Sequence, residues 1–189
     1  MAIPVLKTQR LTLRAFNLAD APRVQSLYGA WEVLRMLLGS PFPYPEGAAE
    51  KWIATHDELK AKGISCLALE MDRQCIGCLR LSVRDAETAD IGYWLGLPYW
   101  GQGFASEAVS EIVRFAFADL RRERITACHH SDNLASARIL DRLAFVETGR
   151  APRFSLSREC DIESVSRELT LQKWSATTAA AQRDERLGP

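Results

Sequence analysis

The chain contains short segments in which apolar and polar positions alternate, and others in which apolar residues run together between turn residues. Alternation predicts half-buried β-strands, and short apolar runs predict buried ones. The segment RLTLRAF alternates and predicts a first strand over Arg10–Phe16. Two apolar runs separated only by Asp72 and Arg73 predict a β-hairpin. The strands expected after the first are Ile64–Met71, Gln74–Val83, Thr88–Gly96, Arg124–His130, a segment near Phe145 and Asp161–Leu171.

Apolar residues at helical spacing predict the helices. From Phe104 to Phe117 they fall on one face, as in a long amphipathic helix. Asn17 or Asp20 is suited to cap an earlier helix, because its side chain accepts hydrogen bonds from free helical N–H groups. A further helix is expected over Glu46–Gly63, and a short one in NLASARILDRLAF. The turn-rich segment GSPFPYP is expected to be an irregular loop that lines a pocket.

The order of these elements predicts a mixed α/β domain. Antiparallel meanders combine with one strand–helix–strand crossover, so we expect a mixed sheet of about seven strands with about four helices. The domain is expected to cover residues 1–174. Few large apolar residues follow Trp174, and residues 175–189 are therefore expected to form a flexible tail.

Composition and charge narrow the function classes. Apolar residues make up 47% of the 189 residues and charged residues 25%, which is ordinary for a globular domain with a core. Lys plus Arg and Asp plus Glu are each 24, and this balance disfavours a nucleic-acid or membrane-surface binder. The segment MAIPVLKTQRLTLR lacks the apolar run of a signal peptide or membrane anchor. Five scattered cysteines are expected to be reduced thiols, and we expect a cytoplasmic protein.

Small residues gather where the strand ending at Gly96 meets the long helix, in LGLPYWGQGFASEA. The first N–H groups of a helix are unpaired and carry a partial positive charge, so Gly101 and Gly103 would let a phosphate approach the backbone closely. The stretch matches neither a Walker A loop nor a Rossmann fingerprint. From the glycines alone, a tight strand–helix turn without a ligand is the preferred interpretation.

The wider stretch IGYWLGLPYWGQGFASEA resembles the acetyl-CoA-binding motif of the GNAT (GCN5-related) N-acetyltransferases. TQRLTLRAFNLADA, CIGCLRLS and DNLASARILDRLAF resemble other landmarks of the RimJ/RimL branch, which acetylates the N-termini of ribosomal proteins. The four landmarks occur in the family's order over residues 8–172. Two positions depart from the pattern: Trp100 stands where the family loop begins with Gln or Arg, and Ala144 stands in the Leu-Gly-Phe motif.

The resemblance implies the GNAT acyl-CoA N-acyltransferase fold, with a splayed central strand pair, and direct transfer of acetyl from acetyl-CoA to a primary amine. No metal is expected. The pyrophosphate would lie on the N–H groups at the start of the long helix, and the pantetheine arm would run along the preceding strand. Arg142 would meet a CoA phosphate, or else lie on a solvated helix face. The implied cofactor-binding residues are Trp94, Leu95, Gly96, Gly101, Gln102, Gly103, Phe104, Ala105, Ser106, Asn133 and Arg142.

The resemblance also implies two catalytic residues. Asp90 matches the strand position where many family members place a Glu, and it is expected to act as general base through a bridging water; the alternative is a solvated residue at a strand start. Ser136 is expected to lie near the thioester sulfur as the acid, or else to bond its own helical turn. Asn133 is expected to cap that helix and to bond the pantetheine amide. The ring of Tyr93 is interpreted as core.

The acceptor remains open at this point. The branch implies a protein or peptide N-terminal amine. The alternatives are a small-molecule amine, such as an amino sugar, polyamine or amino acid, and a non-catalytic acyl-CoA sensor. Glu46, Glu50 and Asp57 either make an acidic acceptor groove or form a solvated helix face. No nucleic-acid or membrane partner is expected, and a homodimer is open.

Overall fold

The computed structural model describes residues 3–186, with side chains described up to residue 180. One eight-stranded sheet has the strand order β1-β2-β3-β4-β5-β6-β8-β7. The strands are β1 (Leu6–Lys7), β2 (Thr12–Ala15), β3 (Ile64–Met71), β4 (Gln74–Val83), β5 (Thr88–Leu95), β6 (Arg124–His130), β7 (Val146–Ser155) and β8 (Cys160–Thr170). The helices are η1 (Leu18–Asp20), α1 (Ala21–Tyr28), α2 (Trp31–Leu34), α3 (Ala48–Ala54), α4 (His56–Ala61), η2 (Leu97–Tyr99), α5 (Phe104–Ala118), α6 (Leu134–Arg142) and α7 (Leu171–Arg186).

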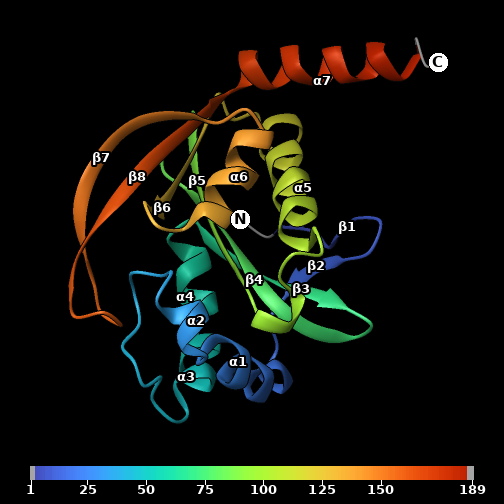
Figure 1. Cartoon of the computed structure of the whole chain (residues 1–189). Coiled ribbons are helices and arrows are strands. Elements are labelled where there is room, and N and C mark those ends of the chain that lie inside the picture. The colour runs from blue at the N-terminus through green and yellow to red at the C-terminus, as the bar shows by residue number, and fades with distance from the viewer. Residues whose placement is uncertain (1–2, 187–189) are drawn as a thin grey trace.

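The sheet is covered on both faces. Helices α5 and α6 lie on one face, and α1 to α4 lie on the other (Figure 1). Side chains alternate along β5 accordingly, since Ile91 joins the core under α5 whereas Trp94 joins the core under α1 and α3. The mixed α/β architecture expected from the sequence is therefore confirmed.

The centre of the sheet opens between β5 and β6. These two strands are parallel, joined by α5, and all other neighbouring pairs are antiparallel. Their ladder runs from Thr88 opposite Arg124 to Ile91 opposite Ala127 and then stops. Beyond it, β5 continues against β4 and β6 continues against β8. The two strands therefore diverge, as expected for a splayed central pair.

Several elements differ from the sequence expectation. β1 has only two residues, too short for any periodicity to register. β7 is far longer than the strand expected near Phe145, and nine of its ten residues are exposed, so no apolar alternation marks it. The helix expected over Glu46–Gly63 divides at Thr55 into α3 and α4. Asn17 caps the single turn η1, which precedes α1.

The C-terminal segment is helical rather than extended. Helix α7 crosses the expected domain boundary, and Trp174 packs against Phe117 of α5 with ring centroids 5.2 Å apart. The rest of α7 projects from the body of the molecule (Figure 1). The predicted flexibility of residues 175–189 stays a prediction, and residues 187–189 lie outside the described residues. No helix within residues 3–186 is both long and apolar enough to cross a membrane.

Helix α6 ends in a Schellman motif that has alanine at the usual glycine position. The N–H of Phe145 donates to the carbonyl of Leu140, and the N–H of Ala144 donates to that of Asp141. Ala144 has φ 64°, the left-handed region that L side chains avoid. Glycine adopts this conformation at no such cost, so the alanine carries backbone strain at this position.

Replacing this alanine by glycine (Ala144→Gly) should stabilise the protein. Relief of the left-handed conformation is worth about 1–2 kcal/mol, and the extra freedom of glycine in the unfolded chain offsets about 0.4–1 kcal/mol of it. We expect Tm to rise by about 2–4 °C, measured by thermal unfolding. In the control, Ala137→Gly in the middle of the same helix, Tm should fall. A drop in both variants would contradict the strain assigned to Ala144.

Candidate active site

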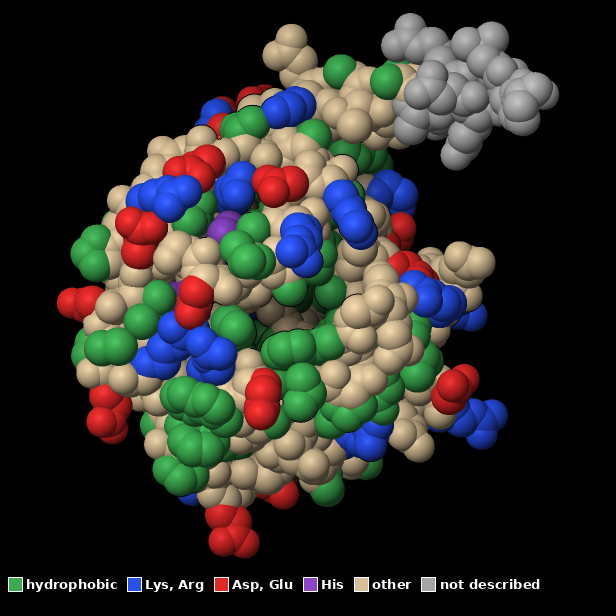
Figure 2. All heavy atoms as spheres, in the orientation of Figure 1, with side chains coloured by type: hydrophobic (Ala, Val, Ile, Leu, Met, Phe, Trp, Pro, Cys, Tyr) green, Lys and Arg blue, Asp and Glu red, His purple; other side chains and the backbone are tan. Residues whose placement is uncertain are grey.

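A cleft of about 1220 Å³ opens where β5 and β6 part. Its walls come from both faces of the sheet: Tyr93 and Ser136 from the side of α6, and Asp90 and Cys128 from the side of α1 to α4. Figure 2 shows the molecule hollowed near its middle, with apolar side chains around the opening. The cleft therefore passes through the sheet and can be entered from two sides.

The glycine loop forms one end of this cleft. Gly101 and Gly103 have φ values of 74° and 83°, which only glycine adopts freely. Gly103 is the N-cap of α5 and supplies no side chain to close the helix. Within the described chain, the backbone N–H groups of residues 101–106 donate no hydrogen bond. This exposed cluster of amide hydrogens at a helix N-terminus fits a diphosphate.

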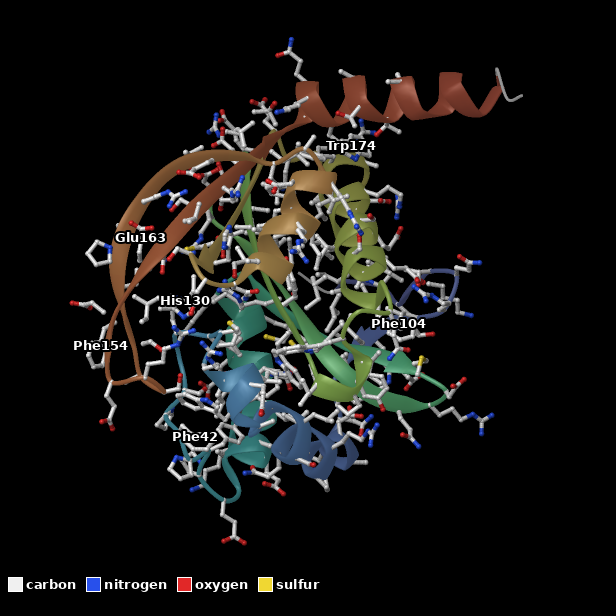
Figure 3. All side chains as sticks on the ribbon, in the orientation of Figure 1. Phe42, Phe104, His130, Phe154, Glu163 and Trp174 are labelled. Carbon is white, nitrogen blue, oxygen red and sulfur yellow. The ribbon has the colours of Figure 1, made fainter. Side chains whose placement is uncertain are left out.

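Arg10 fixes the loop from outside the cleft. Its guanidinium donates to the carbonyl of Gln102 at 2.9 Å and to Glu107 at 2.7 Å, and it lies 4.4 Å from the ring centroid of Phe104. Phe104 is labelled at the start of α5 in Figure 3. Burial raises the pKa of Glu107, but hydrogen bonds from Thr8 and Arg10 outweigh it and lower that pKa overall. Arg10 and Glu107 are 97 positions apart, so no local pattern could have paired them.

The free edge of β5 faces the gap. The N–H of Gly96 donates to Ile76 of β4 at 2.9 Å. Because successive N–H groups of a strand point to opposite edges, the N–H of Leu95 points away from β4, into the gap. The carbonyl of Leu95 accepts the indole N–H of Trp100 at 2.8 Å. Gly96 itself does not line the cleft, and a Cβ there would come within 2.8 Å of Leu27.

Two hydroxyl groups meet on the α6 side of the gap. The oxygens of Tyr93 and Ser136 lie 2.7 Å apart. Asn133 caps α6 by accepting the N–H of Ser136 at 3.1 Å, which fixes the serine at the start of the helix. Burial raises the pKa of Tyr93 to about 12, although the Ser136 bond opposes this. The pair is thus a protonated hydroxyl couple beside the opening.

Asp90 lies on the opposite face of the sheet with its carboxylate engaged. Oδ1 accepts from Arg80 at 2.7 Å and lies 3.5 Å from a guanidinium nitrogen of Arg84, while Oδ2 accepts from Thr126 at 3.1 Å. Two histidines end β6 nearby, and His130 is labelled in Figure 3. Burial lowers the pKa of His129 and of His130, so both rings are neutral at neutral pH.

Most of the sequence-predicted site residues meet in this one cleft. Gln102 and Gly96 do not line it; the side chain of Gln102 donates to Pro98 at 2.9 Å. Sequence reasoning did not predict Tyr93 as a site residue, because its place beside the cleft follows only from the gap between β5 and β6. The predicted residues that line the cleft are Asp90, Trp94, Leu95, Gly101, Gly103, Phe104, Ala105, Ser106, Asn133, Ser136 and Arg142.

The cleft lining decides between the two interpretations of three acidic residues that the sequence left open. Glu46, Glu50 and Asp57 do not line the cleft, so they form no acidic acceptor groove. Among the described residues, no group of three or more His, Cys, Asp or Glu side chains is placed to hold a metal ion. What the cleft offers is therefore an anion site, a hydroxyl pair and an arginine-rich wall.

Comparison with known proteins agrees with this geometry. Residues 10–146 match the acetyltransferase (GNAT) domain family. "Uncharacterized N-acetyltransferase p20" of Bacillus licheniformis is 34% identical over 149 residues, covering 76% of this chain and 83% of that protein. An acetyltransferase (GNAT family) structure from Bacillus anthracis superposes with a TM-score of 0.76 at 17% identity, covering 88% of this chain and 98% of the other.

A third similar protein has been solved with a bound ligand. RimL, a ribosomal L7/L12 α-N-protein acetyltransferase in complex with coenzyme A, has a TM-score of 0.75 at 20% identity, covering 90% of this chain and 98% of its own. At these identities the solved structures establish the fold, and the domain match together with the p20 relative establishes the family. The chain belongs to the GNAT family of acetyltransferases and is an acetyl-CoA-dependent N-acetyltransferase.

Proposed function

We propose that this enzyme acetylates the N-terminal α-amine of a protein or peptide, as the RimJ/RimL branch does. The observation that carries the proposal is the lack of a strong base among the described residues of the cleft: the Asp90 carboxylate is held by two arginines, and both histidines have lowered pKa values. An α-amine, with a reference pKa of about 8, is partly free base at neutral pH, whereas a lysine amine, at about 10.4, is not.

The chain's own groups then divide the work between the two faces of the sheet. The N–H groups of residues 101–106 bind the diphosphate of acetyl-CoA, and Arg142, which lines the cleft, supplies a positive charge for its phosphates. Asn133 and the edge of β5 along Trp94 and Leu95 position the pantetheine arm. The Leu95 N–H, pointing into the gap, polarises the thioester carbonyl.

The transfer is a direct displacement. The amine nitrogen forms a bond to the acetyl carbon, the carbon–sulfur bond breaks, and its electron pair leaves with the CoA sulfur. Ser136 donates its hydroxyl proton to that sulfur and recovers one from Tyr93, 2.7 Å away. Tyr93 regains its own proton from water once CoA has left. The nitrogen loses a proton as it is acylated, and Asp90 accepts it through a water, as a weak base suffices for an acylated ammonium.

A CoA-release assay with a panel of amines tests the function. Peptides with free N-termini should release CoA fastest, ahead of N-blocked lysine peptides, polyamines and amino sugars, and mass spectrometry should place the acetyl group on the α-nitrogen. Faster release with lysine peptides or small amines would refute the N-terminal assignment. Binding of acetyl-CoA without release above background for any amine would leave a sensor instead. The homodimer stays open, and the cytoplasmic location expected from the sequence stays a prediction.

The pH profile follows from the same groups. Between pH 6 and the acceptor's pKa near 8, kcat/KM for a peptide should rise about tenfold per pH unit, because only the free amine attacks. Above that it should level off without falling before about pH 10, because the pKa of Tyr93 is raised to about 12 and its proton remains. A descending limb centred below pH 10 would contradict the role given to Tyr93.

A further inference from the structure

The acceptor side of the cleft carries an excess of positive charge. Among the described residues that line the cleft, Asp90 is the one carboxylate. Five arginines face it: Arg138 and Arg142 from α6, on the side assigned to CoA, and Arg80, Arg84 and Arg153 from the other side. An enzyme for a plain cationic amine has no use for three guanidinium groups at the acceptor's entrance.

The three acceptor-side arginines share one carboxylate partner among the described residues, Asp90. Arg80 and Arg84 both approach Oδ1 of Asp90, at 2.7 and 3.5 Å. Arg153, an exposed residue of β7, makes no ion pair with any described residue. Hydrogen bonding from Cys78 lowers the pKa of the Cys66 thiol, against burial. If Cys66 is counted as a thiolate, the three positive charges of Arg80, Arg84 and Arg153 still exceed the two negative charges of Asp90 and Cys66 by one.

Strand register brings Arg153 to the same face as Asp90. Residues directly opposite in neighbouring strands share a face, and Asp90 lies opposite Thr126 of β6. Two residues further along β6, Cys128 lies opposite Ser166 of β8. Arg153 of β7 lies opposite Ile162, an even number of residues from Ser166 on β8, so it shares this face. The β7–β8 hairpin arcs around this side of the molecule and carries Arg153 to the cleft (Figure 1).

We propose that the acceptor amine carries a carboxylate close to its reacting nitrogen, and that Arg153 and Arg84 bind this carboxylate. The inference rests on the proposed function and narrows it to N-termini with an acidic residue in the first positions. Arg153 is free to pair bidentately with a carboxylate, and Arg84, 3.5 Å from Asp90, can be shared. Arg80 stays with Asp90 and Ser82 and holds the base in place.

Matched acceptors test this directly. Two peptides that differ only in glutamate or glutamine at the second position are compared by kcat/KM, alongside a free amino acid and its amide. We expect the glutamate peptide to be favoured by about tenfold or more, as one charged hydrogen bond contributes about 1.5–3 kcal/mol. If the enzyme preferred the free amino acid over its amide but did not distinguish the two peptides, the recognised carboxylate would be the α-carboxylate of an amino acid. That result would overturn the proposal of an acidic peptide N-terminus.

Variants separate the wall from general electrostatics. Arg153→Gln and Arg84→Gln should each reduce the glutamate-to-glutamine preference at least threefold, with the Kd for acetyl-CoA unchanged. Arg73→Gln removes an equal charge from the exposed β3–β4 turn and should preserve the preference. The proposal would be overturned if the wild type acetylated the glutamate and glutamine peptides equally well, or if its preference for glutamate survived in both cleft variants. A rise in the Kd for acetyl-CoA in Arg153→Gln would overturn it as well. If the wild type bound acetyl-CoA but acetylated none of these acceptors, the N-terminal function itself would fail.

Discussion

Replacing Ser136 by alanine (Ser136→Ala) should lower kcat by about 10²- to 10³-fold, the range that a positioned general acid supplies. The Kd for acetyl-CoA should stay within about threefold, because our proposal places the serine at the leaving sulfur rather than at the diphosphate end of the donor. Stopped-flow measurement of CoA release and calorimetry of acetyl-CoA binding give the two values. Collapse of binding with kcat preserved would make Ser136 a cofactor contact instead.

The 2.7 Å bond to Tyr93 gives this prediction a second arm. If the tyrosine restores the serine's proton, Tyr93→Phe should lower kcat as well, and the double variant should be scarcely worse than either single one. Tyr28 is the matched control, since it is likewise half-buried and its hydroxyl lies 2.8 Å from that of Ser40. Tyr28→Phe should cost stability but leave kcat within a few-fold. If the fold-losses in kcat of the two single variants multiplied in the double variant, Ser136 and Tyr93 would act independently.

Replacing Gly103 by valine (Gly103→Val) should raise the Kd for acetyl-CoA by about 10- to 100-fold, which corresponds to about 1.4–2.8 kcal/mol. A β-branched residue cannot hold φ 83°, and its Cβ would come within 3.2 Å of the Arg10 guanidinium. The loop would rotate, and its N–H groups would no longer converge on the diphosphate.

The control for this variant is a glycine without such a constraint. Gly149 lies on β7, has no atom within 4 Å of an added Cβ and shows no positive φ. Gly149→Val should bind acetyl-CoA as the wild type does, with an unchanged or higher Tm. Equal affinity in both variants would remove the loop from the binding site.

Local sequence patterns predicted the part of the fold that local physics determines. The hairpin strands β3 and β4 and the strand β6 begin and end where periodicity places them, because their apolar runs are bounded by turn or charged residues. The turn at Asp72 and Arg73 has φ of 48° and 63°, as a two-residue hairpin requires. β7 escaped prediction because it is an exposed edge strand, held by pairing with β8 rather than by burial.

The candidate site divides in the same way. The glycine loop is one continuous stretch of sequence, and so is the capped start of α6. The family resemblance could therefore locate each of them. Tyr93 was interpreted as core because periodicity gives the face of a strand but not the gap beside it. The arginine wall depends on Arg153 from β7, and the acidic groove that sequence proximity suggested for Glu46, Glu50 and Asp57 is absent from the described cleft lining. Distances along the chain say little about which charges share a cavity.

The parting of β5 from β6 after Ile91 and Ala127 has a thermodynamic consequence. Backbone groups along that edge lack a neighbouring strand in the free enzyme and depend on water, apart from the Leu95 carbonyl, which accepts from Trp100. The extended, amide-bearing pantetheine arm of acetyl-CoA would pair with this edge as an added strand would, so binding would also stabilise the folded state. Acetyl-CoA at 100 times its Kd should add about 2.7 kcal/mol to the free energy of unfolding. Amide hydrogen exchange along β5 should slow in the same complex. The persistence of this enzyme in a cell would then follow the supply of its own acetyl donor.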